Sequence, residues 1–280
     1  MSYADVVFKN MCRDILENGW WDTEVDVRPR WVNPDGTKTP AHTIRKNFIV
    51  NEYDLSKEFP ALTIRPVPFE KCIDEILWIW VKKSNNVKDL NSRIWDSWAD
   101  ENGSIGSAYG YQLGIKHKYP EGEFDQVDRV LYDLKNNPHS RRIVTNLYNH
   151  NDLHKMKLYP CAYQVIFNVV GDVLSAALIQ RSNDVIVANG WNVAQYAALV
   201  HMFAHVSGLK VGRFIHFIAD AHIYDRHMPF VEELLKRPEY PAPKLWINPE
   251  IKNFYDFTVN DIKLIDYKTN PQIKGIPVAV

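Results

Sequence analysis

The sequence predicts an α+β fold, in which one mixed or largely antiparallel β-sheet packs against long buried helices. Three observations support this prediction. Two β-rich runs, at residues 163–170 and 173–180, are joined by the two-residue turn Gly171-Asp172, the strongest hairpin signature in the chain. A long apolar helix is expected at residues 193–209, and another β-rich run follows it at 213–219. Strands that alternate with buried helices favour the α+β class.

The N-terminal half is expected to hold three helices and a polar loop. Residues 4–17 place apolar side chains at helical spacing and stop at an Asn-Gly pair. The turn at residues 33–36, Asn-Pro-Asp-Gly, separates two short extended arms of a loop that can move. Residues 69–83 form a strongly apolar helix in which Glu75 is the unexpected acid. Residues 125–136 repeat apolar residues every three or four positions, which is typical of an amphipathic helix.

The C-terminal half supplies most of the sheet signals. The long helix at 193–209 is closed by Gly208, and two short extended pieces are expected at residues 244–249 and 262–267. No internal repeat and no low-complexity tract interrupts this pattern, and no linker stands out. A single domain over residues 1–280 is therefore expected.

Composition narrows the functional classes. The chain has 280 residues, of which 46% are apolar and 24% charged, so it is an ordinary globular protein. Its formal net charge of -1 argues against a dedicated nucleic-acid surface, although a local basic cluster is compatible with a neutral total. No stretch of about 18 apolar residues is present to span a membrane, and the N-terminus does not resemble a signal peptide. The odd number of cysteines, 3, indicates a reducing compartment, so a cytoplasmic location is expected.

Cys161 is the most promising reactive residue. It follows a proline and opens into the first hairpin strand, whereas a free cysteine is more often a small buried apolar residue. Arg141 and Arg142 precede it in the chain, and Arg181 and Ser182 follow the second hairpin strand. Arginines lower the pKa of a thiol and bind phosphate with two parallel hydrogen bonds. A thiolate and an anionic substrate could therefore share one pocket.

The remaining candidates are weaker. Cys12 and Cys72 lie in helical patterns and are expected to be core residues. His201 and His205 are four residues apart, as zinc ligands are, but the glutamate of a metalloprotease motif is missing. The pattern therefore favours core or partly buried histidines. The polar segment 220–227 follows a strand and could be a metal site or a substrate grip. No CxxC, Walker, GxGxxG or GxSxG motif occurs, and no metal is predicted.

Several sequence blocks resemble the folate-dependent thymidylate synthase family, which includes the pyrimidine nucleotide hydroxymethylases. The blocks are NNPHSRR, PCAYQ, QRSND, WNVAQY and ADAHIYDRH, with IWDSWADENGSIGSAYG before them and PVAV at the end. They occur in family order from about Glu75 to Val280, and the resemblance is weak before about Phe59.

The resemblance implies an enzyme that methylates dUMP to dTMP with 5,10-methylenetetrahydrofolate as co-substrate and no metal. Cys161 would be the nucleophile that adds to carbon 6 of the uracil ring. Asn192 would read the uracil edge, and Glu75 and Tyr109 would belong to a water-linked network that moves protons.

The resemblance also implies binding residues and a homodimer. Arg28, Arg181 and Ser182 would hold the phosphate, joined by Arg141 and Arg142 reaching in from the second subunit. The deoxyribose hydroxyl would be bound by His222 and Tyr224. The folate would be bound by Trp95, Trp98, Asp184 and Val280.

The chain departs from the family pattern at seven positions near these blocks. These are Ala162 (family histidine), Ile166 (glutamine), Ala188 (glycine), Gly190 (proline), Trp191 (phenylalanine), Arg65 (lysine) and Tyr148 (tryptophan). A changed lining could alter the fate of the exocyclic methylene intermediate. A dUMP hydroxymethylase, in which water traps that intermediate, is therefore the alternative function.

Two further alternatives are less favoured. A cytidylate hydroxymethylase tends to have an aspartate where this chain has Asn192, because a carboxylate accepts from the amino group of cytosine. A non-catalytic nucleotide- or RNA-binding regulator would need neither Cys161 nor Tyr109, and both are present.

Overall fold

A mixed seven-stranded sheet forms the centre of the molecule. The computed structural model describes residues 1–279. The strands, in spatial order, are β1 (Trp20–Trp21), β4 (Thr43–Asp54), β11 (Lys210–Tyr224), β9 (Val173–Gln180), β8 (Ala162–Val170) and β7 (Val144–Asn146), with β10 (Asn183–Asp184) also paired to β11. Strand β11 runs parallel to β9 and β10, and the other pairs are antiparallel. The predicted mixed sheet is confirmed.

Within residues 1–279, six α-helices accompany the sheet, together with three small hairpins. The helices are α1 (Tyr3–Asn18), α2 (Phe69–Trp80), α3 (Gly110–Gly114), α4 (Gln126–Asn136), α5 (Gly190–Ser207) and α6 (Met228–Lys236). The hairpins are β2 (Arg30–Val32) with β3 (Lys38–Pro40), β5 (His117–Tyr119) with β6 (Gly122–Phe124), and β12 (Lys244–Ile247) with β13 (Ile262–Ile265). A π-helical turn at Val185–Asn189 leads into α5, and short 3₁₀ turns lie at Val87–Asp89, Asp96–Trp98, Leu153–Lys155, Asp225–His227, Phe254–Asp256 and Val259–Asp261. None of the helices among residues 1–279 is both long and apolar enough to cross a membrane.

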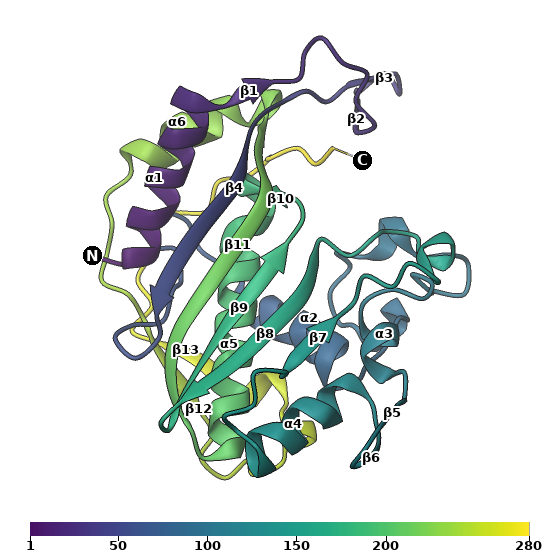
Figure 1. Cartoon of the computed structure of the whole chain (residues 1–280). Coiled ribbons are helices and arrows are strands. Elements are labelled where there is room, and N and C mark those ends of the chain that lie inside the picture. The colour runs from purple at the N-terminus through teal and green to yellow at the C-terminus, as the bar shows by residue number, and fades with distance from the viewer. Residues whose placement is uncertain (280) are drawn as a thin grey trace.

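Helices α2 and α5 form the core with one face of the sheet. Both lie behind the sheet in Figure 1, and they pack against each other. Helix α5 is apolar on nearly every side, as a helix surrounded by protein must be. Phe203 of α5 packs edge-on against Trp80 of α2 and Phe167 of β8, with ring centroids 5.9 and 5.1 Å apart. The expectation of long buried helices is confirmed.

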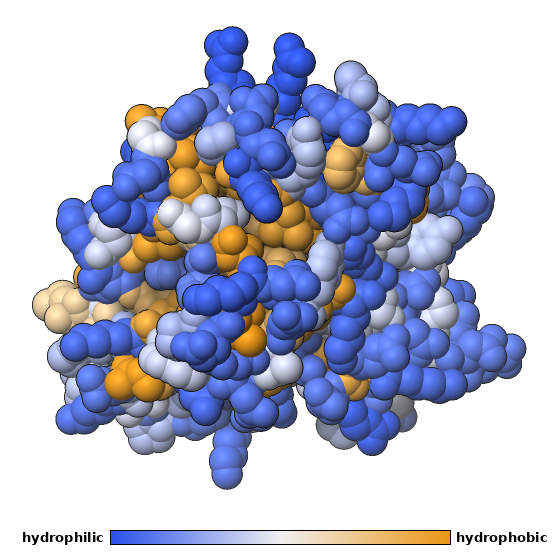
Figure 2. Space-filling view, turned by 90° about the horizontal axis from the view of Figure 1, so that it is seen from below, coloured by the Kyte–Doolittle hydropathy of each residue, from blue (hydrophilic) through white to orange (hydrophobic). Residues whose placement is uncertain are grey.

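The other face of the sheet has no helix over it in Figure 1. The strand register puts Val50 of β4, Phe217 of β11 and Ile179 of β9 in one row across this face. Ile166 of β8 and Val144 of β7 are paired on the same face, and both side chains are exposed. From below, a view that does not look onto this sheet face, the molecular surface is mostly hydrophilic, with hydrophobic residues in the middle and on the left (Figure 2). An open, partly apolar sheet face is therefore a feature of the single chain.

Most local predictions agree with the structure. The hairpin turn is present, with Gly171 at a φ of 63°, and Gly208 caps α5 in the left-handed conformation. Strand β11 is longer than expected, because it continues through the polar segment to Tyr224. Strand β4 was not predicted at all. It has 12 residues that mix charged and apolar side chains, and Phe48 interrupts its alternation with a φ of 52°.

Candidate active site

A cleft of about 820 Å³ lies where several strand ends meet. Because β9 and β11 are parallel and β8 runs antiparallel to β9, the start of β8 and the ends of β9 and β11 lie at the same end of the sheet. The start of α5, the N-terminal loop and the C-terminal tail complete the lining. The volume lies within the usual range of 300 to about 1,000 Å³ for small-molecule sites.

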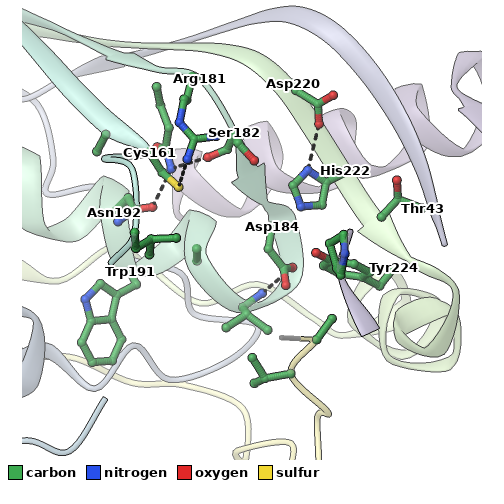
Figure 3. A pocket seen from close by; sticks show the side chains of 18 of the residues that line it. Thr43, Cys161, Arg181, Ser182, Asp184, Trp191, Asn192, Asp220, His222 and Tyr224 are labelled. Atoms are coloured by element: carbon green, nitrogen blue, oxygen red, sulfur yellow. Dashed lines mark hydrogen bonds and ion pairs between the residues drawn. The ribbon is translucent and has the colours of Figure 1, made fainter. Parts of the chain in front are cut away.

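Cys161 lies in this cleft directly before β8. Its backbone N–H donates to the hydroxyl of Tyr109 over 3.2 Å, and its Sγ lies 3.6 Å from Nη2 of Arg181 (Figure 3). Burial raises the pKa of the Cys161 thiol, while Arg181 and Arg28 act in the opposite direction. Of the arginines that the sequence placed near Cys161, Arg181 lies beside the thiol, but burial has the larger effect on the thiol pKa in the single chain.

Arg181 is anchored to the loop that presents Cys161. Its Nη2 donates to the carbonyl of Tyr159 over 2.7 Å, and its Nε donates to the carbonyl of Pro160 over 3.0 Å. Arg28 and Ser182 also line the cleft. Arg181, Arg28 and Ser182 are the residues of one subunit that were predicted to bind the phosphate, and the fold brings them together in one cleft.

Arg141 and Arg142 do not line this cleft. Both are exposed on the segment between α4 and β7, near the sheet edge. A single chain therefore leaves them outside the site, as expected for residues assigned to a neighbouring subunit.

The side-chain amide of Asn192, at the start of α5, is oriented from one side by Gln180. Nε2 of Gln180 donates to the carbonyl of Ser182 and to Oδ1 of Asn192, each over 3.0 Å. A carbonyl only accepts, so the NH₂ group of Gln180 must face it and Oε1 must face His216, whose Nε2 lies at 2.7 Å. Burial lowers the pKa of His216 to about 3, which makes it a neutral donor through Nε2.

Gln195 orients Asn192 from the other side. Nε2 of Gln195 donates to the carbonyl of Cys72 over 3.2 Å and to Glu75 over 2.6 Å. Its Oε1 therefore faces Nδ2 of Asn192, at 3.3 Å. Two backbone carbonyls thus determine which end of the Asn192 amide donates and which accepts. Sequence reasoning missed Gln180, Gln195 and His216, although Gln195 lies one helical turn from Asn192.

Glu75 of α2 is a buried acid at the inner wall of the cleft. Oε1 accepts from the indole N–H of Trp95, and Oε2 accepts from that of Trp191, each over 2.5 Å. Gln195 supplies the third donor, to Oε2. Burial raises the pKa of Glu75, and the three donors partly oppose this increase. The acid embedded in an apolar helix therefore faces the cleft, as the resemblance implied.

Two aromatic groups predicted for the site pack together beside Glu75. The rings of Trp95 and Tyr109 have centroids 4.9 Å apart, and Trp98 packs edge-on against Trp95 at 5.6 Å. Tyr109 adopts a φ of 47°, a strained conformation for a residue other than glycine. Burial raises the pKa of Tyr109, so its hydroxyl is protonated.

The end of β11 brings the predicted sugar-binding residues to the cleft. Nδ1 of His222 donates to Asp220 over 2.9 Å, and the rings of His222 and Tyr224 pack edge-on with centroids 5.2 Å apart. Figure 3 shows these residues across the cavity from Cys161 and Arg181. The polar segment is thus part of the pocket, and sequence reasoning gave Asp220 no role.

Asp184 links the cleft to the C-terminal tail. Oδ1 accepts from the backbone N–H groups of Ile186 and Val187, each over 3.0 Å. His227 lies 3.6 Å from the same carboxylate and holds the tail through the carbonyl of Pro277, at 2.7 Å. Val278 and Ala279 line the cleft, whereas Val280, the predicted folate contact, lies outside the described residues.

The weaker candidates are not in the cleft. Cys12 and Cys72 are fully buried, as predicted. His201 packs against Phe59 and burial lowers its pKa to about 4, whereas His205 bonds to the carbonyl of Ile251. Both side chains are partly buried and contact different residues, which agrees with their interpretation as core or partly buried histidines. Among residues 1–279, no group of three or more His, Cys, Asp and Glu side chains is arranged to hold a metal ion.

Of the seven departures from the family pattern, three line the cleft and four, among them Gly190 and Tyr148, do not. Ala162, Ala188 and Trp191 line the cleft. Ile166 instead faces away from it on the open face of the sheet, and Arg65 donates to the carbonyl of Ile186 over 2.9 Å. Only the first group can therefore touch a bound substrate directly.

Comparisons with known proteins agree with this arrangement. A family model described as thymidylate synthase matches residues 6–280, so the likeness extends through the N-terminal part as well. The chain is 45% identical over 272 residues to a thymidylate synthase of Bacillus subtilis subsp. natto, and 47% identical over 272 residues to that of Bacillus licheniformis, with 96% of each chain covered. The solved structure of thermostable thymidylate synthase A from Bacillus subtilis matches with a TM-score of 0.93 and 44% identity, over 99% of both chains. The chain belongs to the thymidylate synthase family.

Proposed function

We propose that this member of the thymidylate synthase family transfers a one-carbon unit to carbon 5 of dUMP and so produces dTMP. The co-substrate is 5,10-methylenetetrahydrofolate, which supplies both the carbon and the hydride and leaves as dihydrofolate. One observation carries the proposal more than any other. A cysteine, a phosphate-binding arginine, an oriented asparagine amide and a buried acid line a single cleft of about 820 Å³.

Cys161 is the proposed nucleophile. Its thiolate forms a bond to carbon 6 of the uracil ring, and the electron pair of the carbon 5–carbon 6 double bond moves toward carbon 5 and the carbonyl at carbon 4. Carbon 5 then forms a bond to the one-carbon unit and gives up its proton to a base. When the co-substrate delivers its hydride to that carbon, the carbon 5–carbon 6 double bond re-forms and the thiolate leaves. The short distance between Sγ and Arg181, 3.6 Å, supports this role because the guanidinium favours the thiolate.

The phosphate is proposed to bind at Arg181, Arg28 and Ser182. Each hydrogen bond between a guanidinium and a phosphate contributes about 1.5–3 kcal/mol. A second copy of the chain would add Arg141 and Arg142, which are exposed and outside the cleft of their own chain. The open face of the sheet supports a homodimer, because apolar side chains line it.

Asn192 is the proposed reader of the uracil edge. Its amide has a fixed orientation, with Nδ2 and Oδ1 held by Gln195 and Gln180. Uracil offers an acceptor at oxygen 4 and a donor at nitrogen 3, which an amide matches with its NH₂ and carbonyl groups. His222 and Tyr224 are proposed to hold the deoxyribose hydroxyl from across the cleft.

Glu75 and Tyr109 are the proposed proton-handling groups. Glu75 is shielded from bulk water and keeps lone-pair capacity on Oε1, where only Trp95 donates. Tyr109 donates or accepts through a protonated hydroxyl next to the Cys161 backbone. The folate is proposed to bind beside Trp95, Trp98, Asp184 and the C-terminal Val280, of which the first three line the cleft.

The test is a reaction with purified protein, dUMP and 5,10-methylenetetrahydrofolate. The expected result is a rise in dihydrofolate absorbance and a product with the mass of dTMP. No rise in absorbance would contradict the proposal. A product heavier than dTMP by one oxygen would instead indicate the dUMP hydroxymethylase.

Three further proposals concern the chain as a whole. Sedimentation in solution should give the mass of a dimer, and a monomer would contradict the assignment of Arg141 and Arg142. One core cluster extends from Ala4 to Ile262, which supports a single domain over residues 1–280. The cysteines are all unpaired, which supports a reducing, cytoplasmic environment.

A further inference from the structure

Trp191 differs from the other aromatic residues of the cleft because it contacts the buried acid from the nucleotide-reading helix. It is the second residue of α5, directly before Asn192. Gly190 before it packs closely against Leu62, where a Cβ would lie 2.6 Å from Cδ1. The indole N–H of Trp191 donates to Glu75 of α2 over 2.5 Å.

The contacts of Glu75 are unequal on its two oxygens. Among residues 1–279, Oε2 accepts from Trp191 and Gln195, whereas Oε1 accepts from Trp95 alone. Each carboxylate oxygen has about two lone pairs in the plane of the group. Oε2 is therefore fully occupied, and Oε1 keeps one open position.

All three donors are N–H groups, which cannot accept a proton from the acid. A proton on Oε2 would point at a donor and lose a hydrogen bond, whereas a proton on Oε1 can use the open position. The Trp191 N–H also favours the ionised form of Glu75, because it bonds to the carboxylate. An aromatic ring without an N–H would fill the same space with neither effect.

We propose that Trp191 is a positioning residue that confines the transferable proton of Glu75 to Oε1 and stabilises the carboxylate form by a hydrogen bond to Oε2. The proposal deepens the function proposed above and rests on the role given there to Glu75. Trp191 acts through Glu75 and thereby couples the position of the uracil-reading residue Asn192 to that of the acid. Movement of the start of α5 would change both groups together.

The test is the substitution Trp191→Phe, which keeps an aromatic ring and removes the N–H. Infrared spectroscopy follows the carbonyl stretch of the protonated Glu75 carboxyl as the pH of the ligand-free protein is varied. The band is assigned by its loss in Glu75→Gln. We expect the midpoint of this titration to move upward by roughly one pH unit, a tenfold change in the ionisation constant.

The control variant is Trp246→Phe, which removes an exposed indole on β12 and should leave the midpoint unchanged. The acid limb of the kcat profile should move upward with the infrared midpoint in Trp191→Phe, because turnover requires the carboxylate. An unchanged midpoint in a folded Trp191→Phe would overturn the proposal, even if its melting temperature fell. Trp191→Leu is the second variant should the first not fold, with the same expected shift.

The infrared readout needs no turnover, so it separates two kinds of failure. If wild-type protein does not convert dUMP but Trp191→Phe moves the midpoint, the proposed reaction is wrong and the positioning role stands. If wild-type protein converts dUMP and the midpoint does not move, the reaction stands and the positioning role is wrong.

Discussion

Two acids line the cleft, and their neighbours stabilise the ionised form of each in different ways. Burial raises the pKa of the Cys161 thiol, and two formal charges, Arg181 and Arg28, oppose this increase. Burial also raises the pKa of the Glu75 carboxyl, and three neutral N–H donors oppose the increase. The thiolate therefore relies on charge and the carboxylate on hydrogen bonds.

This difference matters when a nucleotide binds. A phosphate dianion beside Arg181 and Arg28 would neutralise much of the charge that favours the thiolate. Two more guanidiniums from a second subunit would offset that loss, which gives the proposed homodimer a chemical purpose. The donors around Glu75 carry no net charge, so neither phosphate nor salt should change their effect on its pKa.

The largest expected effect is at the nucleophile. Cys161→Ser should reduce kcat by roughly 10⁴-fold or more, because a serine hydroxyl is far less ionised and less nucleophilic than a thiol. The affinity for dUMP should stay within a few-fold, which isothermal titration would measure. Cys12→Ala is the matched control, since Cys12 is buried in α1 away from the cleft and should keep its turnover. Equal turnover in Cys161→Ser and wild type would refute the covalent mechanism.

Glu75→Gln tests the acid that is held by the three N–H donors. An amide presents an NH₂ group to one of the indole donors and cannot take up a proton, so kcat should fall by roughly 10²- to 10⁴-fold. The acid limb of the wild-type kcat profile, which reports protonation of the carboxylate, should disappear in the variant. Because the pKa of Glu75 is raised, that limb should lie above the usual carboxyl range in the wild type. A wild-type profile in Glu75→Gln would assign the limb to another group.

Arg181→Gln tests the charge beside the Cys161 thiol. The dUMP dissociation constant should rise on the order of 100-fold, since charge-assisted hydrogen bonds are lost. The pKa of the Cys161 thiol should also rise, because Arg181 is its main favourable charge. Alkylation of the thiol as a function of pH would measure this change.

Salt makes the comparison sharper. In the wild type, the midpoint of the Cys161 thiol titration should rise with ionic strength, because salt screens the arginine charges that favour the thiolate. The Glu75 infrared midpoint should stay constant. Arg13→Gln is the control for the loss of an arginine, because Arg13 is an exposed arginine of α1. Equal salt dependence of the thiol midpoint and the Glu75 midpoint would remove the distinction between charge and hydrogen bonds.

Much of the fold could be predicted because its signals are local. The hairpin depends on Gly171 and its flanking strands, and the end of α5 depends on Gly208. Strand β4 escaped prediction because its order comes from pairing with β11 along eleven register positions, not from its own pattern. Half of its surface faces the open side of the sheet, so polar and apolar residues mix in its sequence.

The site divides in the same way. Cys161, Arg181 and Asn192 could be predicted because they lie in short blocks that resemble a family. The orientation of Asn192 could not, because it depends on Gln180, Gln195 and two backbone carbonyls that only the folded chain brings together. The donor from Trp191 to Glu75 joins residues 116 positions apart, and no sequence period reports such a contact.

The smallest expected effect concerns the amide of Asn192, which Gln195 connects to Glu75. In Asn192→Asp, one carboxylate oxygen can still accept from Gln180, but the other would face Oε1 of Gln195 without a proton between them. Gln195 cannot simply turn over, because its NH₂ group is held by the carbonyl of Cys72 and by Glu75. The new acid should therefore bind best when a donor enters from the substrate, as the amino group of cytosine does. We expect kcat/KM for dUMP to fall on the order of tenfold, and measurable binding of dCMP to appear. Competition between the two nucleotides would measure the change. An unchanged preference for dUMP would mean that Asn192 does not read the base.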